Sequence, residues 1–204
     1  MSRYNGPRVK KMRSLGVDLP GLSRKTMERR PYPPGVHGPR SRRRPSEFRR
    51  QLHEKQKLRF NYGVGERQFR RLVAEAGHSK MPTGDKIVEL LERRLDNVVF
   101  RAGFANTIPA ARQLVNHGHF KVNGRRVDVP SIRVEVGDKI TPRQRSRDKA
   151  CIKEHFEGEW EFRPDWLNVD QKEMVVEVTA LPTRDSVPFA IELQPVVEYY
   201  SKRL

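Results

Sequence analysis

The hydrophobic pattern is most regular between residues 94 and 140, where it predicts two short helices. Apolar residues repeat at helical spacing from Leu95 to Ala102, and a glycine follows where such a helix would end. Thr107 is suited to cap a second helix, which good helix formers continue as far as Gly118.

A β-hairpin is predicted directly after this helix pair. Phe120 and Val122 alternate with polar residues, and Val127 and Val129 alternate in the same way after a two-residue gap. The gap is Asn123-Gly124, the dipeptide most typical of a two-residue hairpin turn.

Alternation continues beyond the hairpin and predicts further strands. It is found at 132–136, at Lys139-Ile140 after a Gly-Asp turn, at 174–178 and at 189–193. We therefore expect a mainly antiparallel sheet. Trp160, Phe162 and Trp166 are expected to pack or cover the core rather than stack on bases, because acidic residues surround them.

Three amphipathic helices are predicted upstream of residue 92. The first is capped by Ser46 and ends at Gly63, the second carries apolar positions from Phe69 to Ala76, and the third begins at Thr83 or Asp85. The expected fold class is α+β, with a small helical domain at 46–92 and a sheet-bearing domain at 93–194.

Residues 1–45 show almost no apolar periodicity and contain seven of the fifteen prolines. Such a segment cannot bury enough surface alone to offset its ordering entropy. We expect a basic arm that folds against its partner; a disordered solubilising tail is the alternative.

Charge narrows the choice of partner. The chain has 42 Lys and Arg against 25 Asp and Glu, a formal charge of +17, and only 35% hydrophobic residues. This excess favours a nucleic acid. Residues 151–204 instead carry more acidic than basic groups, so the polyanion should be held by the first three quarters of the chain.

The sequence gives little support for a membrane protein, an exported protein or an enzyme. No stretch is long and apolar enough to span a membrane, the N-terminus lacks an apolar signal core, and the lone Cys151 excludes an intramolecular disulfide, so we expect a cytoplasmic protein. Phosphate-loop, zinc-protease, serine-hydrolase and CxxC motifs are absent, so no enzyme is expected. His117 and His119 favour RNA contact or exposure over metal binding.

The charged positions of the helix pair and hairpin have no apolar partners left to pack on, so we expect them on the surface, where phosphates would bind. This stretch closely resembles the S-four RNA-binding module; it reads RLDNVVFRAGFANTIPAARQLVNHGHFKVNGRRVDVP. An ordinary solvated basic face is the alternative.

The resemblance extends over nearly the whole chain. It is carried by RYNGP near the start, MERRPYPPGVHG, RRPSEFRRQLHEKQKLRFNYGVGERQFRRL and LLERRLDNVVFRAGF, in that order. These segments are similar to those of the S-four family of bacterial and organellar small-subunit ribosomal proteins. Pro195 to Tyr200 resembles the family's C-terminal helix, which implies that 195–204 returns to the helical domain.

The resemblance implies a structural constituent of the small ribosomal subunit, in the cytoplasm or an organellar matrix. Such a protein binds 16S-type rRNA directly, nucleates assembly of the 5′ domain, contacts incoming mRNA and the neighbouring protein S-five, and influences decoding accuracy. No cofactor or small-molecule substrate is expected. Val9 and Met12 stand where some members begin a cysteine zinc site, so we expect no zinc.

RNA contacts are expected from two basic clusters in the arm and from the segments that match the family. Arg42, Arg43 and Arg44 resemble the basic stretch that faces incoming mRNA. The expected residues are Arg3, Arg8, Lys10, Lys11, Arg13, Arg40, Arg42, Arg43, Arg44, Arg49, Lys55, Lys57, Arg67, Arg70, Arg71, Arg94, Arg101, Arg112, His117, His119, Lys121, Asn123, Arg125 and Arg126.

Two other functions remain open on the residues alone. One is an RNA-modifying enzyme, because the same module is appended to pseudouridine synthases, although the residues after the module leave no room for a catalytic domain. The other is a stand-alone RNA chaperone, which would bind weakly and without preference for one rRNA domain.

Overall fold

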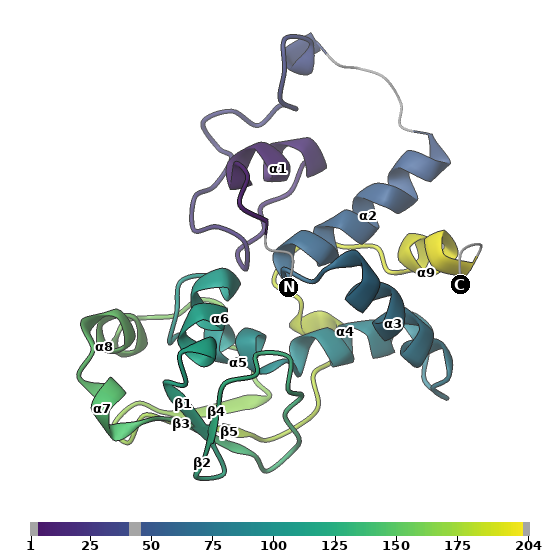
Figure 1. The fold of residues 1–204 in the computed structure, drawn as a ribbon. Helices are drawn as coiled ribbons and strands as arrows, with labels where there is room; N and C mark the ends of the chain where they lie inside the picture. The colour runs from purple at the N-terminus through teal and green to yellow at the C-terminus, as the bar shows by residue number, and fades with distance from the viewer. Residues whose placement is uncertain (1–3, 41–45, 202–204) are drawn as a thin grey trace. The chain divides into compact units, whose positions relative to one another are not determined.

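A computed structural model describes residues 4–40 and 46–201 (Figure 1). The chain divides into two compact units. One is formed by Met1–Ile87 together with Pro188–Leu204, and the other by Val88–Val187. The dividing point falls within helix α4, Thr83–Glu92.

The first unit is helical. Besides the start of α4 it holds α1, Arg8–Leu15, the 3-10 turn η1, Gly38–Arg40, α2, Glu47–Asn61, α3, Glu66–Gly77, and α9, Gln194–Ser201. Ser46 caps α2 as predicted, because its side chain accepts a hydrogen bond of 3.3 Å from the backbone N–H of Arg49. The three predicted helices between 46 and 92 are thus confirmed as α2, α3 and α4.

The first half of the arm contains apolar packing that the sequence did not indicate. Met12 on α1 is fully buried and clusters with Leu19 and Leu22. The backbone N–H of Gly21 donates a 2.9 Å hydrogen bond to Oδ1 of Asn61 at the end of α2. The sequence does not reveal this cluster, because its apolar residues follow no regular spacing. Only α1 is helical, and the other buried residues come from turns and loops.

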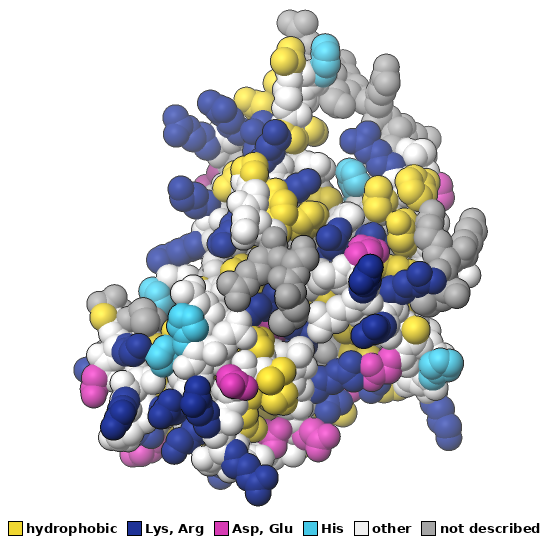
Figure 2. Space-filling view, viewed as in Figure 1, with side chains coloured by type: hydrophobic (Ala, Val, Ile, Leu, Met, Phe, Trp, Pro, Cys, Tyr) yellow, Lys and Arg dark blue, Asp and Glu magenta, His cyan; other side chains and the backbone are white. Residues whose placement is uncertain are grey.

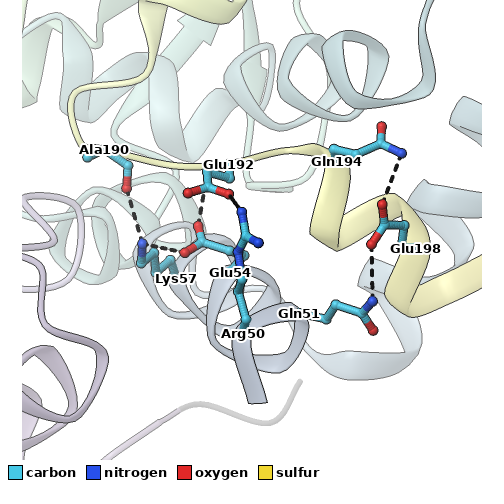
Figure 3. A network of polar contacts seen from close by, with 8 residues as sticks. All are labelled: Arg50, Gln51, Glu54, Lys57, Ala190, Glu192, Gln194 and Glu198. Atoms are coloured by element: carbon cyan, nitrogen blue, oxygen red, sulfur yellow. Dashed lines mark hydrogen bonds and ion pairs between the residues drawn. The ribbon is translucent and has the colours of Figure 1, made fainter. Parts of the chain in front are cut away.

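The C-terminal segment returns to α2 (Figure 3). Helix α9 packs on α2 and α3, and Arg50 on α2 pairs with Glu192. The strand predicted at 189–193 is wrong, because this backbone bonds to α2 side chains instead of to the sheet. The N–H of Glu192 donates to Glu54 at 3.1 Å, and the carbonyl of Ala190 accepts from Lys57 at 3.5 Å.

The second unit combines helices with an antiparallel sheet. The predicted helix pair is confirmed as α5, Leu95–Arg101, and α6, Ile108–Asn116, the latter capped by Thr107. The described strands have the order β2-β1-β3-β5-β4. They are β1 Phe120–Val122, β2 Arg125–Val127, β3 Lys139–Pro142, β4 Leu167–Asp170 and β5 Val175–Val178.

The predicted hairpin is confirmed with its turn. Strand β1 pairs antiparallel with β2, and Phe120 lies opposite Val127. Asn123 and Gly124 have φ values of 50° and 78°, the positive angles that a two-residue turn of this type requires. Asparagine and glycine are the residues that adopt such angles at least cost.

The strand predicted at 132–136 is wrong. This segment makes one isolated bridge to Arg94, and carbonyls at its beginning and just before it accept hydrogen bonds from the start of α5 instead. Leu95 and Asp96 donate backbone hydrogen bonds of 2.8 and 3.1 Å to the carbonyls of Ile132 and Pro130. These N–H groups have no partner inside their own helix, which explains why the segment is drawn away from the sheet.

The core of the second unit is aromatic at its centre. Phe104 is fully buried and stacks on Phe156 with a centroid distance of 4.2 Å, while Phe120 meets it edge-on at 5.1 Å. Trp166 is 5% exposed, which agrees with the expectation that it packs in the core. Strand β4 and the helices α7, Gln144–Arg147, and α8, Ala150–Glu157, lack a clear apolar period and were not predicted.

Candidate nucleic-acid interface

The hairpin carries basic side chains on the face of the sheet that does not bury Phe120. Lys121 lies opposite Arg126 on β2 and Thr141 on β3, and directly opposed residues share a face. Arg126 is exposed on this face, and Arg125 is exposed on the other face, opposite Val122. Figure 2 shows Lys and Arg side chains gathered over the end of this unit where β1 and β2 lie in Figure 1.

The same face becomes acidic towards the other edge of the sheet. Lys139 on β3 pairs with Glu177 on β5 at 3.8 Å, and exposed Asp170 lies on β4. Phosphate would therefore be attracted to the β1 and β2 edge and repelled from β4. On this face, the unpaired positive charge thus lies towards the β1 and β2 edge.

A second basic feature adjoins the hairpin, where α6 turns into β1. We call it the turn cluster, and it consists of His117, His119, Arg126, Arg143 and Lys149. Arg143 donates to the carbonyl of Gly118 at 3.4 Å, and its own backbone N–H donates to the carbonyl of His119 at 2.8 Å. The guanidinium of Arg126 lies directly over Gly118.

The imidazole of His119 is the half-buried member of the turn cluster. Its Nδ1 lies 2.9 Å from the hydroxyl of Ser146, and its Nε2 lies 3.5 Å from Nζ of Lys149. Burial lowers the pKa of His119, and the positive charges of Lys149, His117 and Arg143 lower it further. The ring is thus held neutral near pH 7, where a phosphate at this site would favour its protonation.

The expectation that all basic residues of the helix pair lie on the surface is wrong for three arginines. Arg94 and Arg112 are 3% and 7% exposed and both pair with Asp96, which is fully buried. Arg101 is 3% exposed and pairs with Glu92 at 3.2 Å. Spacing along the chain gave no sign of these carboxylate partners.

The Asp96 carboxylate joins the two helices. It accepts hydrogen bonds from Arg94 at 3.1 and 2.9 Å and from Arg112 on α6 at 2.8 and 2.6 Å. It also accepts from the backbone N–H of Asn97 at 3.0 Å. A buried carboxylate that is fully paired fixes geometry, although its net stabilisation is small compared with the cost of breaking it.

Asn123 is exposed, but its side chain is already bonded within the protein. Its Nδ2 donates to Asp138 at 2.7 Å, and its Oδ1 accepts from the backbone N–H of Lys139 at 2.9 Å. The amide thus ties the hairpin turn to the beginning of β3.

In the helical unit, α2 does not expose all the cations that the sequence suggested. Lys55 is 3% exposed and pairs with Glu66 at 2.9 Å, and Lys57 pairs with Glu54 at 2.6 Å. The ammonium of Lys55 also lies 4.7 Å from the ring centre of Tyr199 on α9. These lysines hold α9 and the preceding segment in place.

Glu66 is the acceptor at the centre of that contact. Tyr200 donates its hydroxyl to Glu66 at 2.7 Å, and Arg59 lies 3.6 Å away. Burial opposes the charged form, yet hydrogen bonds from Lys55 and Tyr200 outweigh it and lower the pKa of Glu66. Burial and the bond to Glu66 raise the pKa of Tyr200.

Other basic residues of the first unit remain accessible. Arg8, Lys10, Arg49, Arg67, Arg70 and Arg71 are exposed, whereas Lys11 and Arg13 are half-buried. Arg13 bonds to the carbonyl of Tyr32 at 3.0 Å. Arg3, Arg42, Arg43 and Arg44 lie outside the described residues, and so does the side chain of Arg40.

The structure adds Arg143 and Lys149 to the candidate residues. The sequence showed them as a basic run, but nothing in their spacing placed them beside His119, because α7 brings them there. Within 4–40 and 46–201, no group of three His, Cys, Asp or Glu could hold a metal ion, and no helix is long and apolar enough to cross a membrane.

Comparison with known proteins also divides the chain into two parts, close to the boundary between the two compact units. Residues 3–92 match the family described as ribosomal protein S4/S9 N-terminal domain, and residues 93–140 match the S4 domain. The chain belongs to the uS4 family of small-subunit ribosomal proteins. It is therefore an RNA-binding component of the small ribosomal subunit and not an enzyme.

The similarity to individual uS4 proteins covers the chain from end to end. Small ribosomal subunit protein uS4 of Methylobacillus flagellatus is 54% identical, and uS4B of Nitrosomonas europaea is 55% identical, each over 100% of both chains. The uS4 protein of Geobacillus stearothermophilus is 48% identical over 99% of this chain and 100% of its own.

Proposed function

We propose that the protein binds the 5′ domain of 16S-type rRNA directly and early, and so nucleates assembly of that part of the subunit. The observation that carries this proposal is the exposed basic edge formed by the hairpin and the turn cluster. Lys121 and Arg126 lie on one face of the hairpin and Arg125 is exposed on the other, whereas Arg94 and Arg112 are buried and paired with Asp96.

The contrast between exposed and buried cations supports an electrostatic grip on the RNA backbone. A buried guanidinium that is already paired with a carboxylate is not accessible to phosphate, whereas the exposed ones release counterions when RNA binds. Each phosphate contact adds about 0.7 to 0.9 to the slope of log affinity against log salt concentration. Recognition should follow RNA shape and backbone, because base edges in A-form helices are hard to reach.

Chemical footprinting on complete small-subunit rRNA tests the proposal. The test variant is Arg125→Ala/Arg126→Ala, and the matched control is Lys172→Ala/Arg184→Ala. Both remove two exposed positive charges from the second unit, but the control removes them away from the basic edge. We expect protection of the 5′ domain, and a salt slope lower by about 2 for the test variant alone.

Either of two results would refute the proposal. One is protection scattered over the whole rRNA, as a non-specific chaperone would give. The other is an equal loss of affinity in both variants, which would mean that net charge alone controls binding.

We also infer that the protein contacts incoming mRNA and the neighbouring protein S-five and thereby influences decoding accuracy. Residues 40–44 support the first contact, since four of these five residues are arginine. A photoreactive residue can be placed at Arg43 in one sample and at an exposed position such as Lys172 in another. The amount of mRNA crosslinked in initiating subunits is then compared between the two positions. Equal capture from both positions would contradict the mRNA assignment.

The S-five contact can be tested in reconstituted subunits by chemical crosslinking followed by mass spectrometry. We expect crosslinked peptides between this chain and S-five when both proteins are present. Subunits that contain both proteins but yield no such peptide would refute this assignment.

A further inference from the structure

The hairpin turn contains a dipeptide with its own chemistry. In an Asn-Gly sequence the backbone nitrogen of glycine attacks the side-chain carbonyl carbon of asparagine, because glycine offers no side chain to hinder the approach. The bond to the side-chain nitrogen breaks, ammonia leaves with the proton of the attacking nitrogen, and a succinimide ring forms. Water then opens the ring to aspartate or isoaspartate.

The structure opposes this reaction at Asn123. The attack requires the asparagine amide to turn towards the nitrogen of Gly124, but both ends of that amide are held by the beginning of β3. Nδ2 donates to Asp138 at 2.7 Å, and Oδ1 accepts from the N–H of Lys139 at 2.9 Å. The backbone N–H of Asn123 also donates to the carbonyl of Lys139 at 2.9 Å.

We propose that Asn123-Gly124 is a latent deamidation site, protected by the folded hairpin, at which modification places a second carboxylate against Asp138 and opens the hairpin. The donor Nδ2 becomes a negatively charged oxygen that faces the Asp138 carboxylate, and like charges at this distance repel. Isoaspartate also lengthens the backbone by one carbon and so disturbs the pairing of β1 with β2.

The consequence for RNA rests on the proposed function. The hairpin presents Lys121, Arg125 and Arg126, so its opening removes three cations from a fixed arrangement. The new negative charge lies in the same turn and opposes phosphate directly. Protection of one amide therefore preserves the basic edge of the sheet.

The chain contains an internal control. Its other Asn-Gly dipeptide is Asn5-Gly6, where Asn5 is exposed and lies outside helices and strands. No hydrogen bond to another described residue holds the Asn5 side chain, and Gly6 is not among the glycines with positive φ. The same chemistry can thus be followed at a held and an unheld site in one sample.

Ageing of the free full-length protein at neutral pH, followed by peptide mass spectrometry, measures both rates. We expect deamidation at Asn123 to be about tenfold or more slower than at Asn5, which corresponds to a hairpin opening free energy of about 1.4 kcal/mol or more. In urea the two rates should converge. Equal rates in the native protein would overturn the proposed protection, and this readout does not depend on RNA binding.

Exchange of the two side chains tests the proposed repulsion. Asn123→Asp should lower the hydrogen-exchange protection of the hairpin and weaken RNA binding. Asn123→Asp/Asp138→Asn should restore both, because the donor and acceptor change places while residue 138 can still accept from the N–H of Glu135, now 2.8 Å away. Unchanged hairpin protection in the single variant, or no recovery in the double variant, would refute the repulsion.

The RNA arm of this test separates the two proposals. If the wild-type protein binds no rRNA, the proposed function fails, while the hydrogen-exchange and ageing results still decide the fate of Asn123. If the wild-type protein binds and Asn123→Asp binds equally well with an open hairpin, the link between this turn and RNA is wrong.

Discussion

Asp96 is the residue whose loss should damage the second unit most. It is fully buried, and its carboxylate accepts from two guanidinium groups, on Arg94 and Arg112, that are themselves almost inaccessible. Asp96→Asn keeps the size of the side chain but removes the negative charge that these two buried guanidinium groups share. Removing one partner from a buried ionic group costs about 3 to 5 kcal/mol.

A loss of this size should be visible in thermal unfolding. For a unit of about 100 residues, 1 kcal/mol lowers the midpoint by roughly 4 to 8 °C, so we expect a decrease of about 12 °C or more. Circular dichroism during heating and urea unfolding would measure it. Asp128→Asn is the control, because this exposed carboxylate should matter by no more than about 0.5 kcal/mol.

The charge argument can be separated from a packing argument. Replacement of all three residues, as Arg94→Met/Asp96→Leu/Arg112→Met, removes these three charges together and should cost clearly less stability than Asp96→Asn alone. A loss below about 1 kcal/mol in Asp96→Asn would refute the reasoning, since such a value is typical of an exposed pair. A triple variant as unstable as Asp96→Asn would show that packing, and not charge, controls this site.

Three further predictions follow from single contacts. Because the pKa of Glu66 is lowered in the folded state, its contribution to stability is present above the ordinary carboxyl pKa and is lost as pH falls through the folded value. Hydrogen exchange of α9 should therefore rise in that acidic range in the wild type. A similar rise in Glu66→Gln would contradict this assignment. Phe104→Ala should destabilise the second unit by about 3 to 5 kcal/mol in urea, because it leaves a cavity between Phe156 and Phe120, and a loss under about 1 kcal/mol would contradict the packing described. Gly118→Ala should cost roughly 1 to 2 kcal/mol for its positive φ and displace the guanidinium of Arg126, so RNA affinity should fall; an unchanged affinity would show that the position of Arg126 is unimportant.

The sequence predicted the elements whose signals are local. The cap at Ser46, the turn at Asn123-Gly124 and the apolar period of α3 each act within a few residues, and the structure contains all three. The strand predicted at 132–136 is absent because the carbonyls of Pro130 and Ile132 accept from the first N–H groups of α5, which is distant in sequence. Strand β4 was missed because it depends on pairing with β5.

The candidate interface shows the same limit. The exposure of Arg125 and Arg126 could be predicted from the sequence, because no apolar partner is left for them in the hairpin. The burial of Arg94, Arg101, Arg112 and Lys55 could not be predicted, because each pairs with a carboxylate of the protein and no local pattern reveals such a pairing. A basic residue in an RNA-binding sequence can therefore pair with a carboxylate of the protein itself as well as contact phosphate.

Cleavage of rRNA from a tethered probe would test most directly whether the hairpin edge faces RNA. With Cys151, the only cysteine of the chain, replaced by serine, a hydroxyl-radical source can be attached through Asp128→Cys beside the hairpin or through Lys172→Cys near β4. We expect strong, localised cleavage in the 5′ domain from the first position and little from the second. Equal cleavage from both positions, or cleavage from Lys172→Cys alone, would contradict the account.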